Sequence, residues 1–369
     1  MDDQDEATIR HVKSVTGFDD QLYASLTAQG RENLEAYVAG CAANTLAAFR
    51  GDLMRWVEWA RSRDVDPLRP AARDVKTWLV EFAHGRKMGT VTRMMRNMSV
   101  AFERIAGGVN PVRSELVKAY VRMLKRQKGT ARKQALAIRV RGDVAEMEDP
   151  PRPFSVDRMI EALRPIDNHW GRRARFLLSF GIDAGRRTSE YLAANMGDVE
   201  LAADGSGVWS IPFSKTDQEG EGTSRYLSKR TMRLFREWND GLAEAGYDVG
   251  PATPVIRYFR CPNFAVFGRM TSTGFIYVIR DIVRRALGRM AEEDPALVAE
   301  IDIDAVVRAV SGHSFRVGMV QDLTVAGESV VSICIEGGWS TMHMAVLYGR
   351  KLGLRGGATA RLRKRLGDE

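Results

Sequence analysis

The sequence predicts a mainly α-helical protein of two domains: an N-terminal helical bundle and a second, mostly helical domain with a small antiparallel β-hairpin. Three observations lead to this fold class. The chain has 369 residues, which is more than one hydrophobic core usually organises. Apolar residues recur at the helical spacing i, i+3, i+4 along most of the chain. One segment, 208–227, instead alternates as a strand on both sides of a polar turn.

The N-terminal region divides into two parts. Residues 1–28 are polar and weakly periodic, so we expect a flexible tail with at most one short helix. Residues 29–129 carry the periodic segments of a helical core domain. We expect its helices near 44–60, 72–84, 90–105 and 114–127, with Asn44 and Thr90 as N-caps.

The fourth of these helices has a basic face. Its exposed basic residues are Lys118, Arg122, Lys125 and Arg126. This face is equally consistent with a polyanion contact and with a solvated surface. The composition then changes over 130–152, which is basic, then acidic, then proline-rich. We expect an interdomain linker here, and its Arg132 and Lys133 are further candidates for polyanion contacts.

The second domain covers 153–369. Residues 208–213 alternate as a strand, and 225–227 resume the strand after a polar, glycine-containing turn. This pattern predicts a β-hairpin, with Lys215 close to its turn. Helices are expected near 155–163, 172–185, 229–245, 272–290, 313–326 and 358–366.

The overall charge is basic. The chain has 55 Lys and Arg against 47 Asp and Glu, a net charge of +8. This excess favours a polyanion partner, although solvated helix faces would give the same count. Cys41, Cys261 and Cys334 have neither disulfide nor metal-ligand spacing, which indicates a reducing, cytoplasmic compartment. Signal-peptide, membrane-span and P-loop patterns are absent from the sequence, so we expect no membrane association and no P-loop use of ATP.

The stretch 311–348 carries the most chemical information. It holds His313 and Arg316 one helical turn apart, Trp339 after two glycines, and Tyr348 after an amphipathic run. An imidazole, a guanidinium, an indole N–H and a phenol can together form half of a phosphoryl-transfer site with a tyrosine nucleophile. Each of these residues alone is more often a core, cap or backbone-bonded side chain.

The other half of such a site lies at 184–191, which reads AGRRTSEY. A guanidinium keeps its charge and donates paired hydrogen bonds to phosphate oxygens. Two of them, Arg187 and Arg316, would stabilise a pentavalent phosphorus without a metal ion. From the residues alone, Arg186 is an alternative to Arg187.

In this order, the motifs resemble those of the tyrosine recombinases, the phage-integrase family. The segment GRRTSE fits the family's G-x-R-x-S-E, and that spacing assigns the first catalytic arginine to Arg187. The run SGHSFRVG, the segment AGESVVSICIEGGWS and the linker letters KQALA are most similar to a phage recombinase of the family. The resemblance covers the catalytic domain well and rests on layout in the N-terminal domain.

The resemblance implies a core-binding, SAM-like N-terminal bundle and the catalytic fold of the family. It implies that Tyr348 attacks the phosphorus to form a 3′-phosphotyrosyl bond, with His313 as the proton acceptor. Lys215 would protonate the departing 5′-oxygen. Lys229 and Lys351 are alternatives for this last role, because a hairpin tip tolerates lysine for solubility alone.

The remaining catalytic candidates support the phosphate. Trp339 would donate its indole N–H to a phosphate oxygen, where many relatives have histidine. Glu190 would orient Arg187 or His313 as a supporting carboxylate. The resemblance implies neither a metal nor a small-molecule cofactor.

The partner that the resemblance implies is double-stranded DNA, held in a C-shaped clamp. Basic residues of the fourth helix and the linker would contact phosphates and set the register. Base readers would lie on two helices. The candidates are Thr90, Arg93, Met94 and Asn97 on the third helix, and Thr273, Tyr277 and Arg280 on the helix 272–290.

The last helix, 358–366, follows a glycine pair and is basic. The resemblance implies a monomer without DNA and a homotetramer on two sites, in which this helix docks into a neighbouring copy. A DNA contact is the alternative for this helix. The implied function is site-specific recombination through a Holliday junction. A type IB topoisomerase or hairpin-forming resolvase with the same chemistry, and a non-catalytic architectural DNA-binding protein, remain alternatives.

Overall fold

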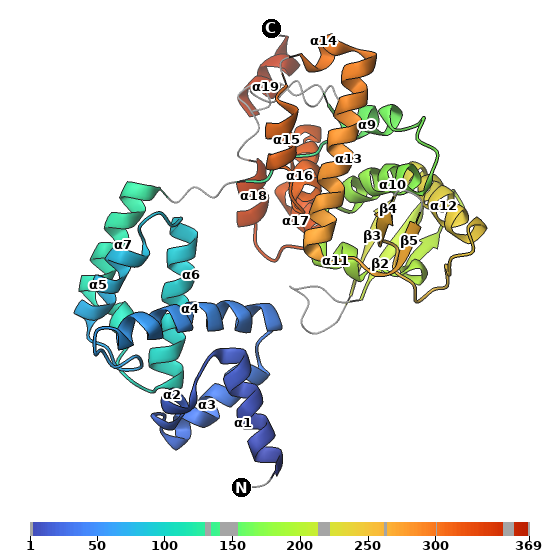
Figure 1. Ribbon diagram of the computed structural model, residues 1–369. Coiled ribbons are helices and arrows are strands. Elements are labelled where there is room, and N and C mark those ends of the chain that lie inside the picture. Colours follow the sequence, from blue (N-terminus) through green and yellow to red (C-terminus); the bar gives the residue numbers. More distant parts are fainter. Residues whose placement is uncertain are drawn as a thin grey trace. The chain divides into compact units, whose positions relative to one another are not determined.

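A computed structural model describes residues 3–129, 134–140, 154–212, 222–261, 264–299, 301–349 and 358–367. The chain divides into two compact units, Met1–Lys133 and Gln134–Glu369, each with its own hydrophobic core (Figure 1). Both units are mainly helical and the second contains small antiparallel sheets, which confirms the predicted fold class. The division falls inside the expected linker 130–152, whose described residues 134–140 belong to the second unit.

The first unit is a helical bundle. Its elements are α1 (Asp3–Thr16), α2 (Asp20–Ala24), α3 (Ala28–Ala39), α4 (Ala43–Arg61), α5 (Ala72–Phe82), α6 (Met88–Ser99), the π-helix η1 (Val100–Ile105), the 3-10 helix η2 (Pro111–Arg113) and α7 (Glu115–Lys128). Helices α4 to α7 confirm the four predicted ones, although Asn44 and Thr90 lie in first turns rather than at N-caps. At the centre, the Trp56 ring meets Trp78 and Phe102 at centroid distances of 5.6 and 5.8 Å.

The predicted flexible tail over 1–28 is wrong for the described part of that range. Helices α1 and α2 form there. Phe18, between the two helices, and Leu22, in α2, are buried in the core of the unit. Asp19 accepts a hydrogen bond from the Leu22 backbone N–H at 2.8 Å and pairs with Arg61 of α4 at 2.6 Å. A turn between the two helices interrupts the apolar periodicity, which made the segment look unstructured.

The second unit surrounds α10 with helices and a small sheet. Its elements are α9 (Val156–Ala162), α10 (His169–Ala184), α11 (Thr188–Ala193), the 3-10 helix η3 (Met196–Asp198), β1 (Val199–Leu201), β2 (Gly207–Ile211), β3 (Thr223–Leu227), α12 (Lys229–Glu244), β4 (Arg257–Cys261), β5 (Phe264–Arg269), α13 (Ser272–Glu293), α14 (Pro295–Val298), α15 (Ile303–Ala309), α16 (Ser314–Ala326), α17 (Val330–Gly337), α18 (His343–Gly349) and α19 (Ala358–Leu366).

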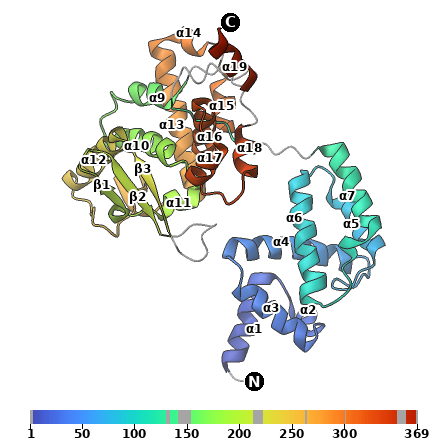
Figure 2. The same cartoon turned by 180° about the vertical axis from the view of Figure 1, so that it is seen from behind.

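The predicted hairpin is confirmed. Strand β2 pairs with β3 in antiparallel register, with Trp209 opposite Arg225, and β1 extends the sheet (Figure 2). A second antiparallel pair, β4 with β5, was not predicted. Its strands mix arginine with aromatic residues and lack a clear alternation of apolar and polar positions, so the sequence gives little strand signal there.

Helix α10 sets the position of the first catalytic candidates. It contacts α9, α12, β3 and α16. Gly181 allows the close approach of α16, because a Cβ at this position would lie 2.6 Å from the Phe315 ring. The helix ends at Gly185, whose φ of +55° favours glycine. After this left-handed turn, Arg186 and Arg187 lead into α11, with Arg187 as its N-cap.

Candidate active site

Arg187 lies at the N-terminus of α11. Its backbone N–H donates to Glu190 Oε2 at 3.1 Å, so the two residues close the first turn of the helix. Its Nη1 donates to Glu190 Oε1 at 2.8 Å. The Glu190 side chain is 3% exposed and that of Arg187 is 18% exposed. The buried carboxylate therefore orients a guanidinium that keeps part of its surface accessible.

Arg186 points into the interior instead. Its side chain is 1% exposed, and its Nε lies 2.9 Å from Glu190 Oε2. A Cβ added to Gly338 would overlap Arg186 Nη1, so this guanidinium packs against the glycine turn before Trp339. Burial acts to raise the pKa of the Glu190 carboxyl, but the charges of Arg186 and Arg187 outweigh it and hold the pKa below its usual value. Burial of Arg186 favours Arg187 as the arginine available to a ligand.

Arg316 comes from the first turn of α16. Its side chain is buried, and its Nη2 donates to the Gly337 carbonyl oxygen. The guanidinium carbon lies 4.1 Å from the centre of the Trp339 ring. Burial, with repulsion from Arg187, lowers the pKa of Arg316 to about 10, so the group stays protonated at neutral pH. Its Nη1 is buried and has no hydrogen-bond partner among the described residues.

His313 immediately precedes α16. Its backbone N–H donates to Ser311 Oγ at 3.2 Å, which fixes the start of the helix. The side chain keeps an exposed surface at the rim of the cluster. Partial loss of hydration and the positive charges of Arg316 and Arg187 lower the pKa of the imidazole. His313 is therefore neutral at physiological pH and able to accept a proton.

Trp339 and Tyr348 complete the cluster. Helix α17 ends at Gly338 with φ +60°, and the Trp339 backbone N–H donates to the Cys334 carbonyl oxygen at 2.9 Å. Tyr348 lies near the end of α18. Its ring meets that of Trp339 edge-on, at a centroid distance of 5.7 Å and an interplanar angle of 63°. Both side chains are half-buried.

The structure brings six of the seven catalytic candidates together. They are Arg187, Glu190, His313, Arg316, Trp339 and Tyr348. Lys215 lies outside the described residues. The cluster gathers two guanidinium groups, a neutral imidazole and a phenol. This combination can bind a phosphate group and present a nucleophile to it.

Comparison of sequences shows a similarity to the recombinase Cre of Escherichia phage P1. The two chains are 24% identical over 319 residues, which cover 83% of this chain and 84% of the phage protein. The expected similarity to a phage recombinase is thereby confirmed. No protein-family model matches the chain.

Comparison of structures shows the same fold in two solved proteins. The Tn1549 transposon integrase, in complex with transposon right end DNA, has a TM-score of 0.57 at 14% identity, over 92% of this chain and 98% of the integrase chain. XerH site-specific recombinase, bound to palindromic difH substrate, has a TM-score of 0.56 at 12% identity, over 98% of this chain and 94% of the XerH chain. In sequence this chain is similar to one site-specific recombinase, and in fold it is similar to two other solved enzymes of DNA rearrangement. At these identities the solved structures support the fold alone.

Two of the predicted base readers of this chain have partners inside the protein. Arg93 donates from Nε and Nη2 to the carboxylate of Asp52, at 3.0 and 2.8 Å. Asn97 Nδ2 donates to the same carboxylate at 2.7 Å, and Asp52 is fully buried. Their hydrogen bonds thus satisfy a buried charge and hold α6 to α4.

Of the predicted base readers on α13, one is bound within the protein and two are exposed. Arg280 donates from Nε to the Val310 carbonyl and from Nη2 to the Arg308 carbonyl, at 2.9 and 3.0 Å, so it holds the C-terminal end of α15. Thr273 and Tyr277 lie on the exposed side of α13, and Tyr277 is 68% exposed. These two residues are accessible to a ligand.

The predicted basic face of α7 is exposed in the structure. Val117 and Leu124 bury the opposite side of the helix. The exposed basic side chains are Lys118, Arg122, Lys125 and Arg126. Lys118 and Arg122 each pair with Glu115, at 3.1 and 3.4 Å. Arg132 and Lys133 lie outside the described residues.

Four residues beside the cluster support it, and of these only Arg186 was considered from the sequence, as the alternative to Arg187. Arg186 packs against the glycine turn, and Arg225 of β3 donates from Nη2 to the Ile335 carbonyl at 2.9 Å. Gln134 and Gln321 donate to the Tyr348 carbonyl. The tandem arginines were a usable signal for Arg186. The other three contacts join residues far apart in the sequence, so no local pattern reveals them.

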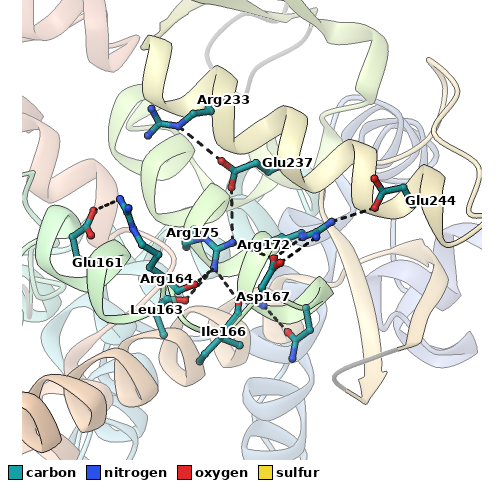
Figure 3. Close-up of polar contacts among 12 residues, drawn as sticks. Glu161, Leu163, Arg164, Ile166, Asp167, Arg172, Arg175, Arg233, Glu237 and Glu244 are labelled. Carbon is teal, nitrogen blue, oxygen red and sulfur yellow. Dashed lines mark hydrogen bonds and ion pairs between the residues drawn. The ribbon is translucent and has the colours of Figure 1, made fainter.

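A hollow of about 880 Å³ lies elsewhere in the second unit, between α9, α12 and the end of α13. None of its lining residues is a catalytic candidate. Figure 3 shows the polar contacts beside it: Arg175 donates to the carbonyls of Leu163 and Ile166, at 3.0 and 2.9 Å, and lies 3.8 Å from Glu237. These interactions hold α9 and α12 on α10, which indicates a structural role.

Within the part of the chain that the structure describes, no cluster of three or more His, Cys, Asp or Glu side chains is arranged to hold a metal ion. None of the helices in this part is both long and apolar enough to cross a membrane.

Proposed function

We propose that this protein is a site-specific recombinase that cuts and rejoins double-stranded DNA through a covalent bond between Tyr348 and a 3′-phosphate. The observation that carries the proposal is the contact series Arg316, Trp339, Tyr348, with Arg187 close enough to lower the pKa of Arg316. Two neighbouring guanidinium groups repel each other, so placing both beside a phenol is unfavourable unless an anion offsets their charge. They suit an anion that binds between them.

The chemistry follows from the side chains. The Tyr348 hydroxyl oxygen attacks phosphorus, and its proton passes to the neutral imidazole of His313. The bond from phosphorus to the 5′-oxygen breaks, and Lys215 supplies a proton to that oxygen. Attack by another strand's 5′-hydroxyl on the phosphotyrosyl bond reverses these steps. One phosphodiester is exchanged for another through the protein-linked ester, so the reaction consumes neither ATP nor a metal-activated water.

The arginines stabilise the charge that develops on the phosphorane. Arg187 and Arg316 donate to the non-bridging oxygens, and the Trp339 indole N–H adds a neutral donor. Glu190 holds the orientation of Arg187 before substrate arrives. Because these groups are already positioned, little reorganisation is needed at the transition state.

We further infer that four copies assemble on two DNA sites and exchange strands through a Holliday junction. Helices α17 and α18 and the turn between them carry exposed apolar side chains. They are Val331, Ile335, Met342 and Val346, at 55%, 65%, 55% and 51% exposure. Helix α19 carries exposed Leu362 and Leu366, at 52% and 62%. Apolar faces of this kind are covered in assemblies, and we infer that α19 covers such a face on a neighbouring copy, head to tail.

Trapping on a nicked duplex tests the central claim. A nick a few nucleotides 3′ of the scissile phosphate makes the released fragment, which carries the 5′-hydroxyl, short enough to diffuse away. Wild type should therefore accumulate a covalent protein–DNA complex. Tyr348→Phe should bind the same duplex and form none. A covalent complex with Tyr348→Phe, or none with wild type on any selected binding site, would overturn the proposal.

A second assay separates recombination from its alternatives. Joining of two sites on separate linear duplexes requires strand exchange, whereas relaxation of supercoiled DNA requires only one cut. Junction intermediates and joined products with wild type support a recombinase. Relaxation without joined products would indicate a topoisomerase, and binding without cleavage would indicate an architectural protein.

A further inference from the structure

Two glutamine side chains hold the backbone carbonyl of Tyr348. Gln134 Nε2 donates to it at 3.0 Å and Gln321 Nε2 donates to it at 3.3 Å. A carbonyl oxygen has two lone pairs, so these amides can satisfy both. The carbonyl lies in the last turn of α18, where the carbonyls of a helix need partners from outside it.

Helix α18 packs against α16 and α17, and Tyr348 lies against the core, but little of the helix is buried. It has seven residues, all described, and only Ala345 among their side chains is buried. A short helix with so little buried apolar surface is held weakly by packing. The two amide contacts are therefore a substantial part of what fixes the position of the tyrosine.

Gln134 itself comes from a well-anchored segment. The Leu136 N–H donates to the Ala309 carbonyl and the Ile138 N–H to the Ser314 carbonyl, each at 3.1 Å. The Val140 N–H donates to Asp322 at 2.9 Å. Gln134 thus reaches Tyr348 from an irregular segment bound along α15 and α16, and it is also the first residue of the second unit.

Gln321 reaches the same carbonyl from α16. That helix also carries Arg316, the phosphate-binding candidate, and the Gln321 side chain is 3% exposed. One rigid helix therefore supports both the proposed phosphate site and the backbone of the proposed nucleophile. Sites built on rigid elements hold their geometry more accurately than sites on loops.

We infer that Gln134 is a positioning residue for the reaction: its amide N–H holds the Tyr348 backbone so that the phenol stays aligned with the phosphate. This inference rests on the proposed function. Gln134 contacts neither phosphate nor phenol in this role, so its loss should slow cleavage without weakening DNA binding.

The test compares three side chains of similar length at one position. Gln134→Leu removes the donor, Gln134→Glu replaces it with an acceptor, and Gln134→Lys restores a donor. Gln29→Leu, at an exposed glutamine of the first unit, is the matched control. Each full-length variant is assayed for single-turnover covalent trapping on a nicked duplex, for affinity on the intact duplex, for Tm, and for hydrogen exchange across 342–349.

We expect trapping to fall about five- to tenfold with Leu and with Glu, and about twofold or less with Lys and with the control. Affinity and Tm should not change, and exchange across 342–349 should rise with Leu and Glu alone. Equal losses with Leu and Lys, wild-type trapping with Leu, or a parallel loss of affinity and Tm would each overturn the inference. If wild type traps no DNA, the proposed function fails, and the exchange measurement still decides whether Gln134 holds α18.

Discussion

The guanidinium carbon of Arg316 lies 4.1 Å from the centre of the Trp339 ring. The ring therefore covers one face of the cation and meets the Tyr348 ring on its own edge. Trp339 can act in two ways: its ring orients Arg316, and its indole N–H is a donor for phosphate.

Substitutions at Trp339 separate these two contributions. Trp339→Phe keeps an aromatic face and removes the donor, so we expect single-turnover cleavage to fall about tenfold. Trp339→Ala removes both the ring and the donor. Its cleavage rate should fall further, by a factor that corresponds to about 1–2 kcal/mol for a partly buried cation–π contact. Cleavage rates on the nicked duplex at saturating protein measure both. Equal rates for Phe and Ala would show that the ring face contributes nothing.

The lowered pKa of His313 gives a pH dependence. Loss of hydration and the nearby arginines favour the neutral imidazole, which is the form that accepts the Tyr348 proton. Cleavage should therefore be constant above about pH 6.5, the ordinary value for histidine, and fall as the pH drops below it. A pH–rate profile of single-turnover cleavage measures the midpoint.

His313→Gln is the control for this profile, because glutamine does not titrate. We expect a slower reaction and loss of the acidic limb. A wild-type midpoint above pH 7, or an unchanged acidic limb in His313→Gln, would show that another group accepts the proton.

Arg186 and Arg187 should respond to substitution in opposite ways. Arg187→Met removes a donor to the transition state, so cleavage should fall about 10²–10³-fold, or about 2.7–4 kcal/mol. Its side chain is partly exposed, so stability should change little. Arg186→Met leaves a buried carboxylate with one partner fewer, and the free energy of unfolding should fall by about 3 kcal/mol. Urea denaturation and trapping on the nicked duplex give the two readouts. A large stability loss with Arg187→Met and none with Arg186→Met would reverse the assignment.

The N-terminal helices should contribute to the stability of the first unit. Phe18→Ala removes a buried ring from its core, and we expect a loss of about 3–5 kcal/mol in the free energy of unfolding. Asp20→Ala, at an exposed side chain of the same segment, is the control and should cost about 0.5 kcal/mol or less. Denaturation of the full chain, followed by tryptophan fluorescence, measures both. Equal, small losses would restore the expectation of a flexible tail.

The sequence predicted the residues of the cluster better than their supports. Arg187, His313, Arg316, Trp339 and Tyr348 stand in local motifs whose spacing can be read directly. The hold of Gln134 on Tyr348 joins positions 214 residues apart, and only the folded chain brings them together. Periodicity likewise located the long helices, since each buries one face.

Prediction from the sequence failed where turns interrupt the apolar pattern or where side chains have partners inside the protein. The short helices α1 and α2 were missed because a turn separates their apolar residues. Arg93 and Arg280 looked like base readers because a charged residue on a helix face suggests a free side chain. In the fold, Arg93 meets a buried aspartate and Arg280 meets carbonyls at a helix end. Sequence pattern does not show such partners in advance.

Gly338 offers a test of how closely the two halves of the cluster are packed. It ends α17 with φ +60°, and a Cβ there would overlap Arg186 Nη1. In Gly338→Ala, the left-handed backbone should cost about 1–2 kcal/mol of stability, because alanine disfavours it. The overlap should also displace the turn that precedes Trp339. Gly327→Ala is a matched control, because φ there is +86° and nothing lies within 4 Å of an added Cβ.

Both variants should lose a similar amount of stability from backbone strain, and Gly338→Ala should lose more from the overlap. Cleavage should separate them clearly. In Gly338→Ala the displaced turn moves Trp339 and the Gly337 carbonyl that Arg316 binds, so we expect trapping to fall by about 10²-fold while DNA affinity is kept. In Gly327→Ala the turn is untouched and trapping should stay within about twofold of wild type. Equal trapping by the two variants would mean that Arg186 and the glycine turn are not mechanically connected to the reaction.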